Sequence, residues 1–489
     1  MRPHSGRGGT NRQRNLALTV GLIASFMTLL DVSIVNVAVP SIERALKASP
    51  SELQWVLSGY ALTFGLVLVA AGRFGDIHGR RNVFIAGLAL FTVSSAAAGL
   101  ATSPEWLIIA RLIQGAAAGV VNPQVVGMIQ QMFQGSERGR PFGLLGSVIG
   151  ISTAIGPLLG GLLIALDGTH EGWRLVFFVN VPVGIATIIF GWRVLPPHRP
   201  GPEKSFDPVA VLLLGFGVTL LLLPLIEERQ WQGFLKWLLI PAAGLVLTGF
   251  VYWERHYRRR GEPLFDLALF RHRSYSLGSL IALLYFAGFT ALFFVFTLFL
   301  QNGLRYSALA AGLAVTPFAL GSAGSAILGG RLVIRFGRPL VAIGLTLVAL
   351  GLIGTMVALH FVPGHGAPYA TAAPLLLAGL GSGLVITPNQ TLTLAEVPVE
   401  RGGAAAGMLQ TGQRIGSAAG IAGVGTVFFD ALASTHNGWA RAFRDALLIA
   451  LGFVLVALVA AVVDILAGRR AAGRPGAATA SGSATGGPG

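Results

Sequence analysis

The stretch from Leu16 to Pro40, LALTVGLIASFMTLLDVSIVNVAVP, decides the fold, and its only charged side chain is Asp31. About 20 apolar residues at 1.5 Å per residue cross a ~30 Å hydrocarbon core. In lipid a backbone segment has to satisfy its own hydrogen bonds, which a helix does. The stretch is also too long for a signal peptide and has no small-residue cleavage site. It therefore predicts an uncleaved first membrane-spanning helix.

The composition extends this prediction to the whole chain. Of 489 residues, 53% are hydrophobic and 11% are charged, whereas a soluble protein carries about 25% charged residues. Alternation of apolar and polar residues at every second position is not seen, which argues against a membrane β-barrel. The chain has no cysteine, so disulfides, thiolate metal sites and cysteine nucleophiles are excluded.

Apolar runs recur to the C-terminal end and predict fourteen membrane-spanning helices. The runs cover residues 16–40, 54–72, 82–101, 105–131, 141–166, 174–195, 208–226, 235–253, 276–301, 307–330, 339–360, 371–394, 403–429 and 442–467.

The net charge of +15 would suit a nucleic-acid partner, but a membrane protein carries the same excess in its cytoplasmic loops. With a cytoplasmic N-terminus, most of the 35 Lys and Arg residues fall in the tails and loops of that side. An even number of spans then places both termini in the cytoplasm. We expect a multi-pass protein of the plasma membrane with the lipid bilayer, and no nucleic acid, as a partner.

Two segments form an internal repeat. Gly72–Arg80 (GRFGDIHGR) follows the second predicted helix and Gly330–Arg338 (GRLVIRFGR) follows the tenth, with Gly, Arg, Gly and Arg at the same offsets. Chance similarity of short Gly- and Arg-rich segments remains an alternative. Matching positions favour two parallel halves with a binding site between them. The expected organisation is a cytoplasmic tail (1–15), a six-helix bundle (16–195), linkers with two inserted helices (196–275), a second six-helix bundle (276–467) and a disordered cytoplasmic tail (468–489).

Six segments, in this order, carry a resemblance to a known family: Leu30–Pro40, Gly72–Arg81, Leu107–Gly115, Gly146–Gly161, Trp173–Gly184 and Pro263–Tyr275. The chain resembles the major facilitator superfamily, specifically its fourteen-helix drug–proton antiporter branch of the EmrB/QacA type, over residues 16–467. The resemblance implies an all-α fold of two six-helix bundles plus two inserted helices. It implies proton-coupled efflux of small amphipathic molecules such as drugs and antibiotics by a protein that needs no cofactor and functions as a monomer.

Asp31 is the candidate for proton coupling, because burial in lipid favours the neutral carboxylic acid and lets the group bind and release a proton. The resemblance implies the same role. A permanent structural pairing with an arginine or a serine is the alternative. Arg111 lies at a compatible depth in the fourth predicted helix, and the resemblance implies that it assists proton relay; a fixed link between helices remains open.

Polar side chains within the predicted spans are candidates to line a substrate cavity. Arg414, near the middle of the thirteenth span, stays charged in any environment and needs a partner. An apolar cavity with a few amides suits bulky amphipathic molecules. The phenylalanines of residues 276–301 are expected to face lipid more often than substrate. The cavity candidates are Gln114, Asn122, Gln124, Asn389, Gln390, Gln410, Gln413 and Arg414.

The turn after the second predicted helix is a candidate conformational latch. Its residues are Gly72, Asp76, Gly79, Arg80 and Arg81. A carboxylate is stabilised at a helix N-terminus, and the repeat nominates the helix that starts near Gly402 and Gly403. The second copy has Ile334 in place of Asp76 and therefore lacks the acid. A turn that only fixes topology is the alternative.

Glycines make one face of the fifth predicted helix nearly free of side chains, and such faces allow close helix packing. Packing and gating predict the same pattern, so both remain open. The residues are Gly146, Gly150, Gly156, Pro157, Gly160 and Gly161.

Other function classes lack their sequence signatures. No G-x-x-x-x-G-K-[ST] motif for ATP binding occurs, and no H-E-x-x-H metal motif or G-x-S-x-G elbow in a plausible context. We therefore expect no enzyme, no metal and no cofactor, with an ion gradient as the energy source. Exporting one specific metabolite, lipid or siderophore is the alternative to multidrug efflux.

Overall fold

The computed structural model describes residues 11–167, 171–196, 207–226, 231, 233–258, 264, 267–362, 364–434 and 438–472, and this part of the chain is helical with no strand. Thirteen helices in it are long and apolar enough to cross a membrane. The long helices are α1 Asn11–Leu46, α2 Pro50–His78, α3 Arg80–Gly99, α4 Pro104–Met132, α5 Gly139–Asp167, α7 Asn180–Val194, α8 Pro208–Ile226, α9 Leu239–Tyr257, α10 Arg273–Leu298, α11 Ala308–Phe336, α12 Arg338–Phe361, α13 Ala367–Thr393, α14 Gly402–Ser434 and α15 Trp439–Ala472.

All fourteen predicted spans fall on helices. The sixth is divided between a short α6 (Trp173–Phe178) and α7, and together these two form one span. Three short helical turns adjoin two other spans: η2 (Phe234–Leu238) precedes α9, η3 (Leu267–Arg271) precedes α10, and η4 (Phe299–Gly303) follows α10. Two further turns, η1 (Gly135–Arg138) and η5 (Val399–Arg401), precede α5 and α14. The predicted all-α membrane fold is confirmed.

The prediction that Gly72–Arg80 forms a turn is wrong, because α2 continues to His78 and α3 begins at Arg80. Only Gly79, with φ of 94°, makes the turn. The repeat segment behaves in the same way: α11 runs to Phe336, and Gly337 turns with φ of 58°. Positive φ is readily adopted by glycine. Hydropathy placed the helix ends too early because these helices extend past their apolar stretch into polar sequence.

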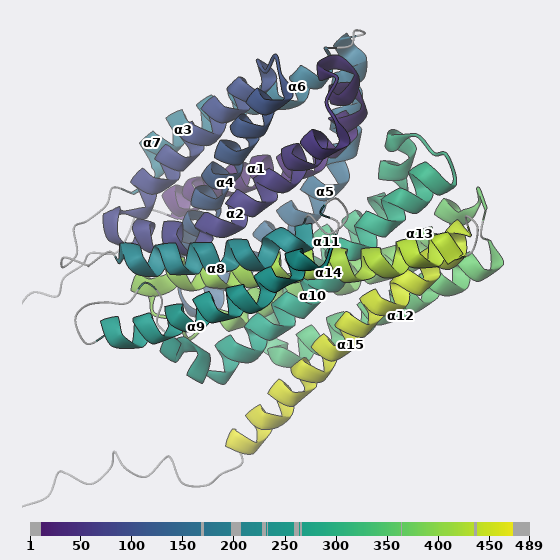
Figure 1. Cartoon of the computed structure of the whole chain (residues 1–489). Coiled ribbons are helices and arrows are strands. Elements are labelled where there is room, and N and C mark those ends of the chain that lie inside the picture. The colour runs from purple at the N-terminus through teal and green to yellow at the C-terminus, as the bar shows by residue number, and fades with distance from the viewer. Residues whose placement is uncertain are drawn as a thin grey trace, which may run out of the picture.

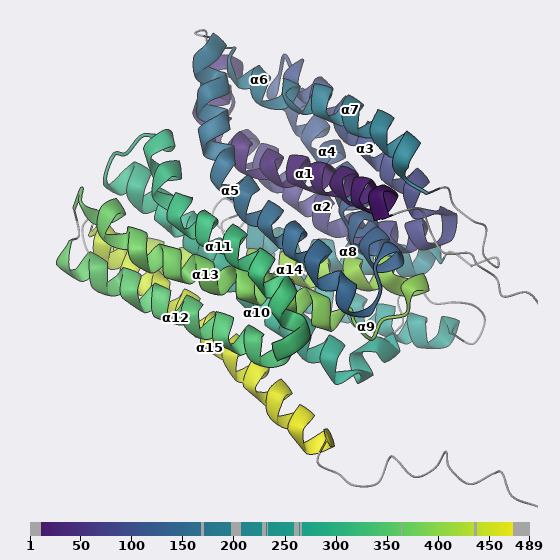
Figure 2. The ribbon, with the colours of Figure 1, turned by 180° about the vertical axis from the view of Figure 1, so that it is seen from behind.

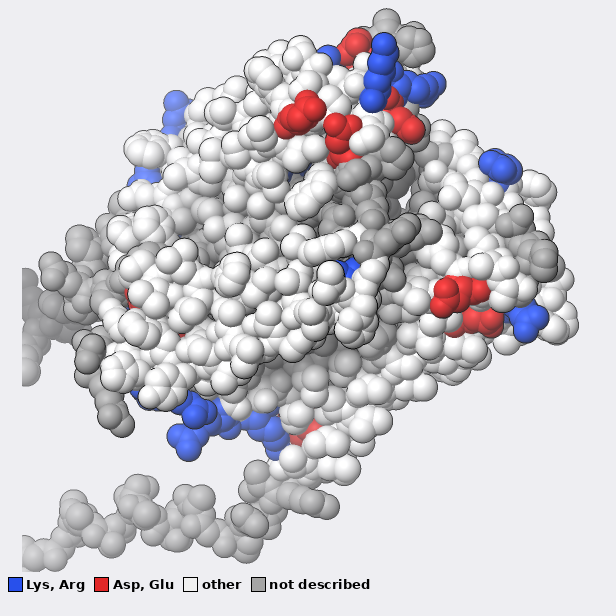
Figure 3. Space-filling model, viewed as in Figure 1, with Lys and Arg blue, Asp and Glu red and all other residues white. Residues whose placement is uncertain are grey.

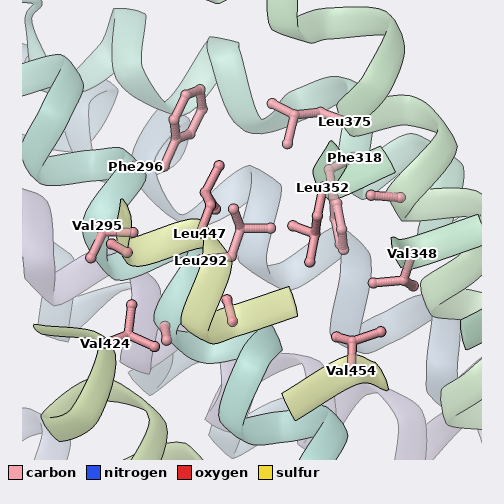
Figure 4. Close-up of a cluster of buried hydrophobic side chains, with 14 of the residues drawn as sticks. Leu292, Val295, Phe296, Phe318, Val348, Leu352, Leu375, Val424, Leu447 and Val454 are labelled. Carbon is pink, nitrogen blue, oxygen red and sulfur yellow. The ribbon is translucent and has the colours of Figure 1, made fainter. Parts of the chain in front are cut away.

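The helices form two groups, which we call the N-terminal half (α1–α7) and the C-terminal half (α10–α15) (Figure 1). The core of the C-terminal half brings α10, α11, α13, α14 and α15 together through apolar side chains such as Leu292, Phe318 and Leu447 (Figure 4). In the N-terminal half, Ile34 and Leu107 pack with Trp173 in a second cluster. Each half therefore has buried apolar contacts of its own.

The inserted helices α8 and α9 lie across the two halves. On α8, Leu214, Val218 and Leu222 belong to a cluster with Val69 of α2, against which Ile415 of α14 also packs. Figure 1 shows α8 and α9 in front, whereas α5, α11 and α13 face the viewer in Figure 2, which is drawn from behind. The inserted pair therefore covers the junction of α2 and α14 on one side of the molecule.

Few charged residues lie on the broad middle of the visible face, and most gather toward its ends (Figure 3). The α10 phenylalanines do not form this surface. Phe296 and Phe299 are buried, and Phe286, Phe289 and Phe293 are half-buried against the core of the C-terminal half. The expectation that they face lipid is therefore wrong for Phe296 and Phe299, because α10 packs against α14 and α15.

The two halves meet backbone to backbone at the end that carries the predicted cytoplasmic turns. A Cβ atom added to Gly139 of α5 would lie 1.9 Å from the carbonyl oxygen of Gly330 of α11. A Cβ atom added to Gly72 of α2 would lie 2.3 Å from the carbonyl oxygen of Gly403 of α14. Figure 2 shows the opposite end of α5 standing apart from α11. Glycine is therefore required where the halves close.

Candidate functional site

Asp31 lies at the centre of a buried polar network within the N-terminal half. Its carboxylate forms an ion pair with Arg111 of α4, and both side chains are almost fully buried. Gln114 Nε2 and Asn180 Nδ2 each donate a hydrogen bond of 2.9 Å to Asp31 Oδ1. A guanidinium and two amide donors stabilise the charged form of a carboxylate. The structure therefore surrounds the Asp31 carboxylate with one cation and two amide donors.

Arg111 joins this network to α2. Its Nε donates to the carbonyl oxygen of Val56 at 3.1 Å, and its guanidinium lies 4.2 Å from the centre of the Tyr60 ring. The Tyr60 hydroxyl donates to the carbonyl oxygen of Thr28 on α1 at 3.1 Å. The network therefore ties α1, α2 and α4 together through one charged pair.

Asn180 is a site residue that sequence reasoning did not single out. It is the first residue of α7 and also donates to Ser95 Oγ of α3 at 3.1 Å. The available signal was a buried amide inside an otherwise apolar span, because a polar side chain at membrane depth needs a partner.

Asp76 connects the two halves at their closed end. Its carboxylate accepts hydrogen bonds from the backbone amides of Gly403 at 3.3 Å and Ala404 at 3.1 Å, in the first turn of α14. Arg80 pairs with the same carboxylate at 2.8 Å and donates to the carbonyl oxygen of Val399 at 2.6 Å. The carboxylate thus accepts hydrogen bonds from free backbone amides at a helix N-terminus, where the macrodipole favours an anion. We call Gly72, Asp76, Arg80, Gly403 and Ala404 the Asp76 latch.

Arg81 does not join this latch, although the sequence grouped it there. It donates to the carbonyl oxygen of Trp192 at the end of α7 and lies 5.0 Å from that ring. Gly79 only makes the turn between α2 and α3.

The C-terminal half has an acid at its own equivalent end, supplied by another helix. Arg338, the counterpart of Arg80 in the repeat, pairs at 2.7 Å with Asp464 of α15, which also pairs with Arg273 at 2.9 Å. Asp464 is 1% exposed. The interpretation that this half lacks an acidic partner because Ile334 replaces the aspartate is therefore incomplete. The sequence missed Asp464 because it stands near the end of an apolar span.

The glycines of α5 serve two different contacts. A Cβ atom on Gly146 would lie 2.2 Å from Thr387 Oγ1 of α13, and one on Gly150 would lie 3.2 Å from the carbonyl oxygen of Ala319 of α11. Gly156 and Gly160 instead face Ser33 and Ile34 of α1 in their own half. The first part of α5 therefore packs between the halves and the later part packs within one. Gly161 has open space around it in the described structure, and the side chain of Pro157 lies outside the described residues.

Five of the predicted cavity residues are buried, and four of these make structural hydrogen bonds. Gln114 donates to Asp31, and Asn122 donates to Thr28 Oγ1 at 3.1 Å. Gln124 donates to the carbonyl oxygen of Ala71 at 2.8 Å, and Asn389 donates to that of Gly278 at 2.8 Å. Gln390 is 7% exposed.

The other three candidates, Gln410, Gln413 and Arg414, stand together on α14 and are half-buried. The Arg414 guanidinium lies 4.1 Å from the centre of the Phe64 ring of α2. Among the described residues, no hydrogen-bond acceptor or carboxylate partner contacts that guanidinium. The C-terminal half thus presents an unpaired cation to α2 of the other half.

Comparisons with known proteins agree with this architecture. A sequence model of the Major Facilitator Superfamily matches residues 21–421. A protein described as "Probable actinorhodin transporter" from Streptomyces coelicolor is 36% identical over 439 residues, which cover 88% of this chain and 76% of that protein. The tetracenomycin C resistance and export protein of Streptomyces glaucescens is 34% identical over 90% of this chain and 80% of that protein. The multidrug resistance protein Stp of Mycobacterium tuberculosis is 33% identical, with 87% and 78% covered.

Solved structures show the same fold at low sequence identity. The proton:xylose symporter XylE superposes with a TM-score of 0.66 at 14% identity and covers 92% of this chain and 95% of its own. The human organic anion transporter MFSD10 superposes with a TM-score of 0.64 at 15% identity and covers 92% of this chain and 99% of its own. The family model spans most of the chain, and the relatives exceed 30% identity over most of both lengths. The chain is a membrane transporter, not an enzyme, and it belongs to the major facilitator superfamily.

Proposed function

We propose that the chain exports small amphipathic molecules, antibiotics among them, across the plasma membrane in exchange for protons. The relatives named for export of actinorhodin and tetracenomycin C, and for multidrug resistance, support the direction and the cargo. Asp31 is the observation that carries the coupling, because it is a carboxyl group held inside the first span by one cation and two amides. A proton gradient, rather than a bound cofactor, supplies the energy.

The cycle follows from the contacts at the two ends of the molecule. The Asp76 latch and the contact of α5 with α11 hold the halves together at one end, which supports an outward-facing state closed on the cytoplasmic side. Protonation of Asp31 from outside neutralises its charge and releases Arg111, which holds Val56 and Tyr60 of α2. Since α2 also carries Asp76, the release is transmitted to the latch and favours the inward-facing state. Both termini are cytoplasmic and one chain is sufficient for transport.

Transport into everted membrane vesicles tests this proposal. A panel of antibiotics is offered with an imposed proton gradient, and uptake is compared before and after the gradient is collapsed by a protonophore. We expect uptake of at least one compound that depends on the gradient and is lost in Asp31→Asn. Uptake that is equal with and without a gradient would contradict proton coupling, and uptake of a single compound would restrict the function to specific export.

A further inference from the structure

We propose that Arg414 binds a negatively charged group of the cargo, so that the preferred cargo class is aromatic organic anions such as carboxylic acids and ionised phenols. The inference rests on the proposed export function and narrows its substrate class. Four observations support it: the missing partner of Arg414, the direction of its helix face, the amides beside it and the aromatic side chains nearby.

The first observation is a cation without an anion. Arg80 and Arg111 are buried and Arg338 is half-buried, and each of the three contacts a carboxylate. Arg414 has only the Phe64 ring among the described residues, although it stands in the middle part of a membrane-spanning helix. A charged side chain at that depth costs about 2.5–3.5 kcal/mol on insertion scales, and a cation–π contact returns about 0.5–2 kcal/mol. An anionic ligand would supply the missing interaction.

The second observation is the direction in which this part of α14 faces. Gly403 and Gly407 of α14 pack on backbone atoms of α2, and Gly416 and Gly420 pack on carbonyl oxygens of α10. The 3.6-residue period places the positions 410, 413 and 417 between these two contact faces and position 414 on the α2 face beside them. Met408 and Ile415, which pack toward α8, lie on another face. The stripe therefore faces the junction of the two halves and not the lipid.

The third observation concerns the amides in this stripe. Gln410 and Gln413 are half-buried, and no described residue forms a hydrogen bond with either side chain. The carboxamide of each offers two donors and an acceptor. A guanidinium flanked by free amide donors is a suitable site for a carboxylate or a phenolate, because Arg forms paired hydrogen bonds with such groups.

The fourth observation is the aromatic side of the neighbouring helix. Thr290 of α10 and Ser417 of α14 form a hydrogen bond of 2.8 Å, which places the α10 phenylalanines next to the stripe. Phe289 and Phe293 are half-buried and pack on Phe318 of α11, with ring centres 5.8 and 4.9 Å apart. Phe286 lies one turn before Thr290 on the same face. These rings provide apolar contact area for the body of an aromatic molecule.

Together the four observations discriminate between cargo classes. A cationic molecule would meet a like charge that no carboxylate of the described residues offsets, and a neutral molecule would leave Arg414 unpaired. The charged group of an aromatic anion can pair with the guanidinium and accept hydrogen bonds from the amides. Its aromatic rings can pack against the phenylalanines.

Equilibrium binding to the full chain in lipid nanodiscs, without a gradient, tests the assignment. Three fluorescent or ultraviolet-absorbing acids (1-pyrenebutyric acid, 1-naphthoic acid and 9-anthracenecarboxylic acid) are each compared with their methyl esters, which remove the acidic charge and keep the rings. We expect at least one acid to bind about tenfold or more tightly than its ester, a difference of about 1.4 kcal/mol. In Arg414→Gln this preference falls to about one, while ester binding reports that the variant is folded. Arg414→Lys should keep part of the preference for the acid over its ester. Arg140→Gln, which removes an exposed charge, should keep the whole preference.

Equal binding of each acid and its ester, failure of all three acids to bind, or an unchanged preference in Arg414→Gln would overturn the assignment. These outcomes are separate from a failure of the proposed function, because the binding measurement uses no proton gradient. Acid preference with no gradient-driven uptake in vesicles would contradict coupled export and leave the anion site standing.

Discussion

Tyr60 and Phe64 lie one turn apart on α2 with ring centres separated by 6.2 Å, and each ring carries an arginine from a different helix. Arg111 of α4 lies over Tyr60 at 4.2 Å, and Arg414 of α14 lies over Phe64 at 4.1 Å. The first arginine holds Asp31, and the second is the proposed anion site. These two rings therefore connect the proposed proton site to the proposed cargo site.

Replacing Phe64 by leucine should weaken this connection while leaving the proton site intact. Loss of the cation–π contact costs about 0.5–2 kcal/mol, so cargo affinity should change by roughly thirtyfold at most. We expect fewer protons released per bound cargo molecule than in the wild type, measured with a pH indicator dye during calorimetric titration. Phe91→Leu, at a buried ring of α3 in the same half, should keep the wild-type ratio. An unchanged ratio in Phe64→Leu would remove the ring pair from the coupling.

The substitution Asp76→Asn should open the cytoplasmic side more often. Hydrogen bonds to charged groups are worth about 1.5–3 kcal/mol, and this change weakens two backbone contacts and the ion pair with Arg80. Since the chain has no cysteine, Thr387→Cys at the contact of α5 and α13 gives a unique thiol. We expect membrane-impermeant maleimide, applied to everted vesicles, to label it about tenfold faster in the Asp76→Asn background.

Arg81→Gln is the matched control for the latch, because Arg81 contacts Trp192 in its own half. In the Arg81→Gln background, maleimide should label the Thr387→Cys thiol at the same rate as in the protein that carries Thr387→Cys alone. Equal labelling rates for Asp76→Asn and Arg81→Gln would mean that Asp76 only fixes topology.

Two glycine substitutions in α5 should separate gating from packing. Gly146→Ala introduces a methyl group against Thr387 of the other half, so it should hold the cytoplasmic contact open and accelerate labelling at a cysteine placed elsewhere on that seam, such as Ala326→Cys. Gly156→Ala introduces a methyl group against Ser33 of the same half, so it should lower the melting temperature and leave the labelling rate unchanged. Gly161→Ala, which meets open space, should change neither. Identical effects of the first two changes would contradict the division.

The Asp464→Asn change should destabilise the C-terminal half. It leaves Arg338 and Arg273 without their shared carboxylate, and removing one partner of a buried ion pair costs about 3–5 kcal/mol. We expect a lower temperature at which the purified protein loses its monodisperse elution peak. For Asp430→Asn, at an exposed position of α14, the free energy of unfolding should stay within about 0.5 kcal/mol of the parent value. Equal melting temperatures for the two variants would show that Asp464 is not needed for stability.

The sequence predicted the number and order of the helices because apolar length is set by the bilayer, a constraint local to each segment. It predicted that Asp76 meets the start of α14 because the repeat relates the halves. It did not predict the ion pairs of Asp464, since those pairs depend on how α15 packs beside α12. It also placed Gln124 and Asn389 in a cavity, whereas both amides satisfy backbone carbonyls. Partner choice among buried amides depends on helix rotation, which hydropathy does not report.

Proton release on cargo binding tests the central claim most directly. Purified protein in weakly buffered detergent solution is titrated with a transported compound at a series of pH values, and the released protons are counted with an indicator dye. The wild type should release up to about one proton per bound molecule, and Asp31→Asn should bind the compound and release none, because an amide has no proton to give up in this range. Release by Asp31→Asn equal to that of the wild type would contradict proton exchange at Asp31.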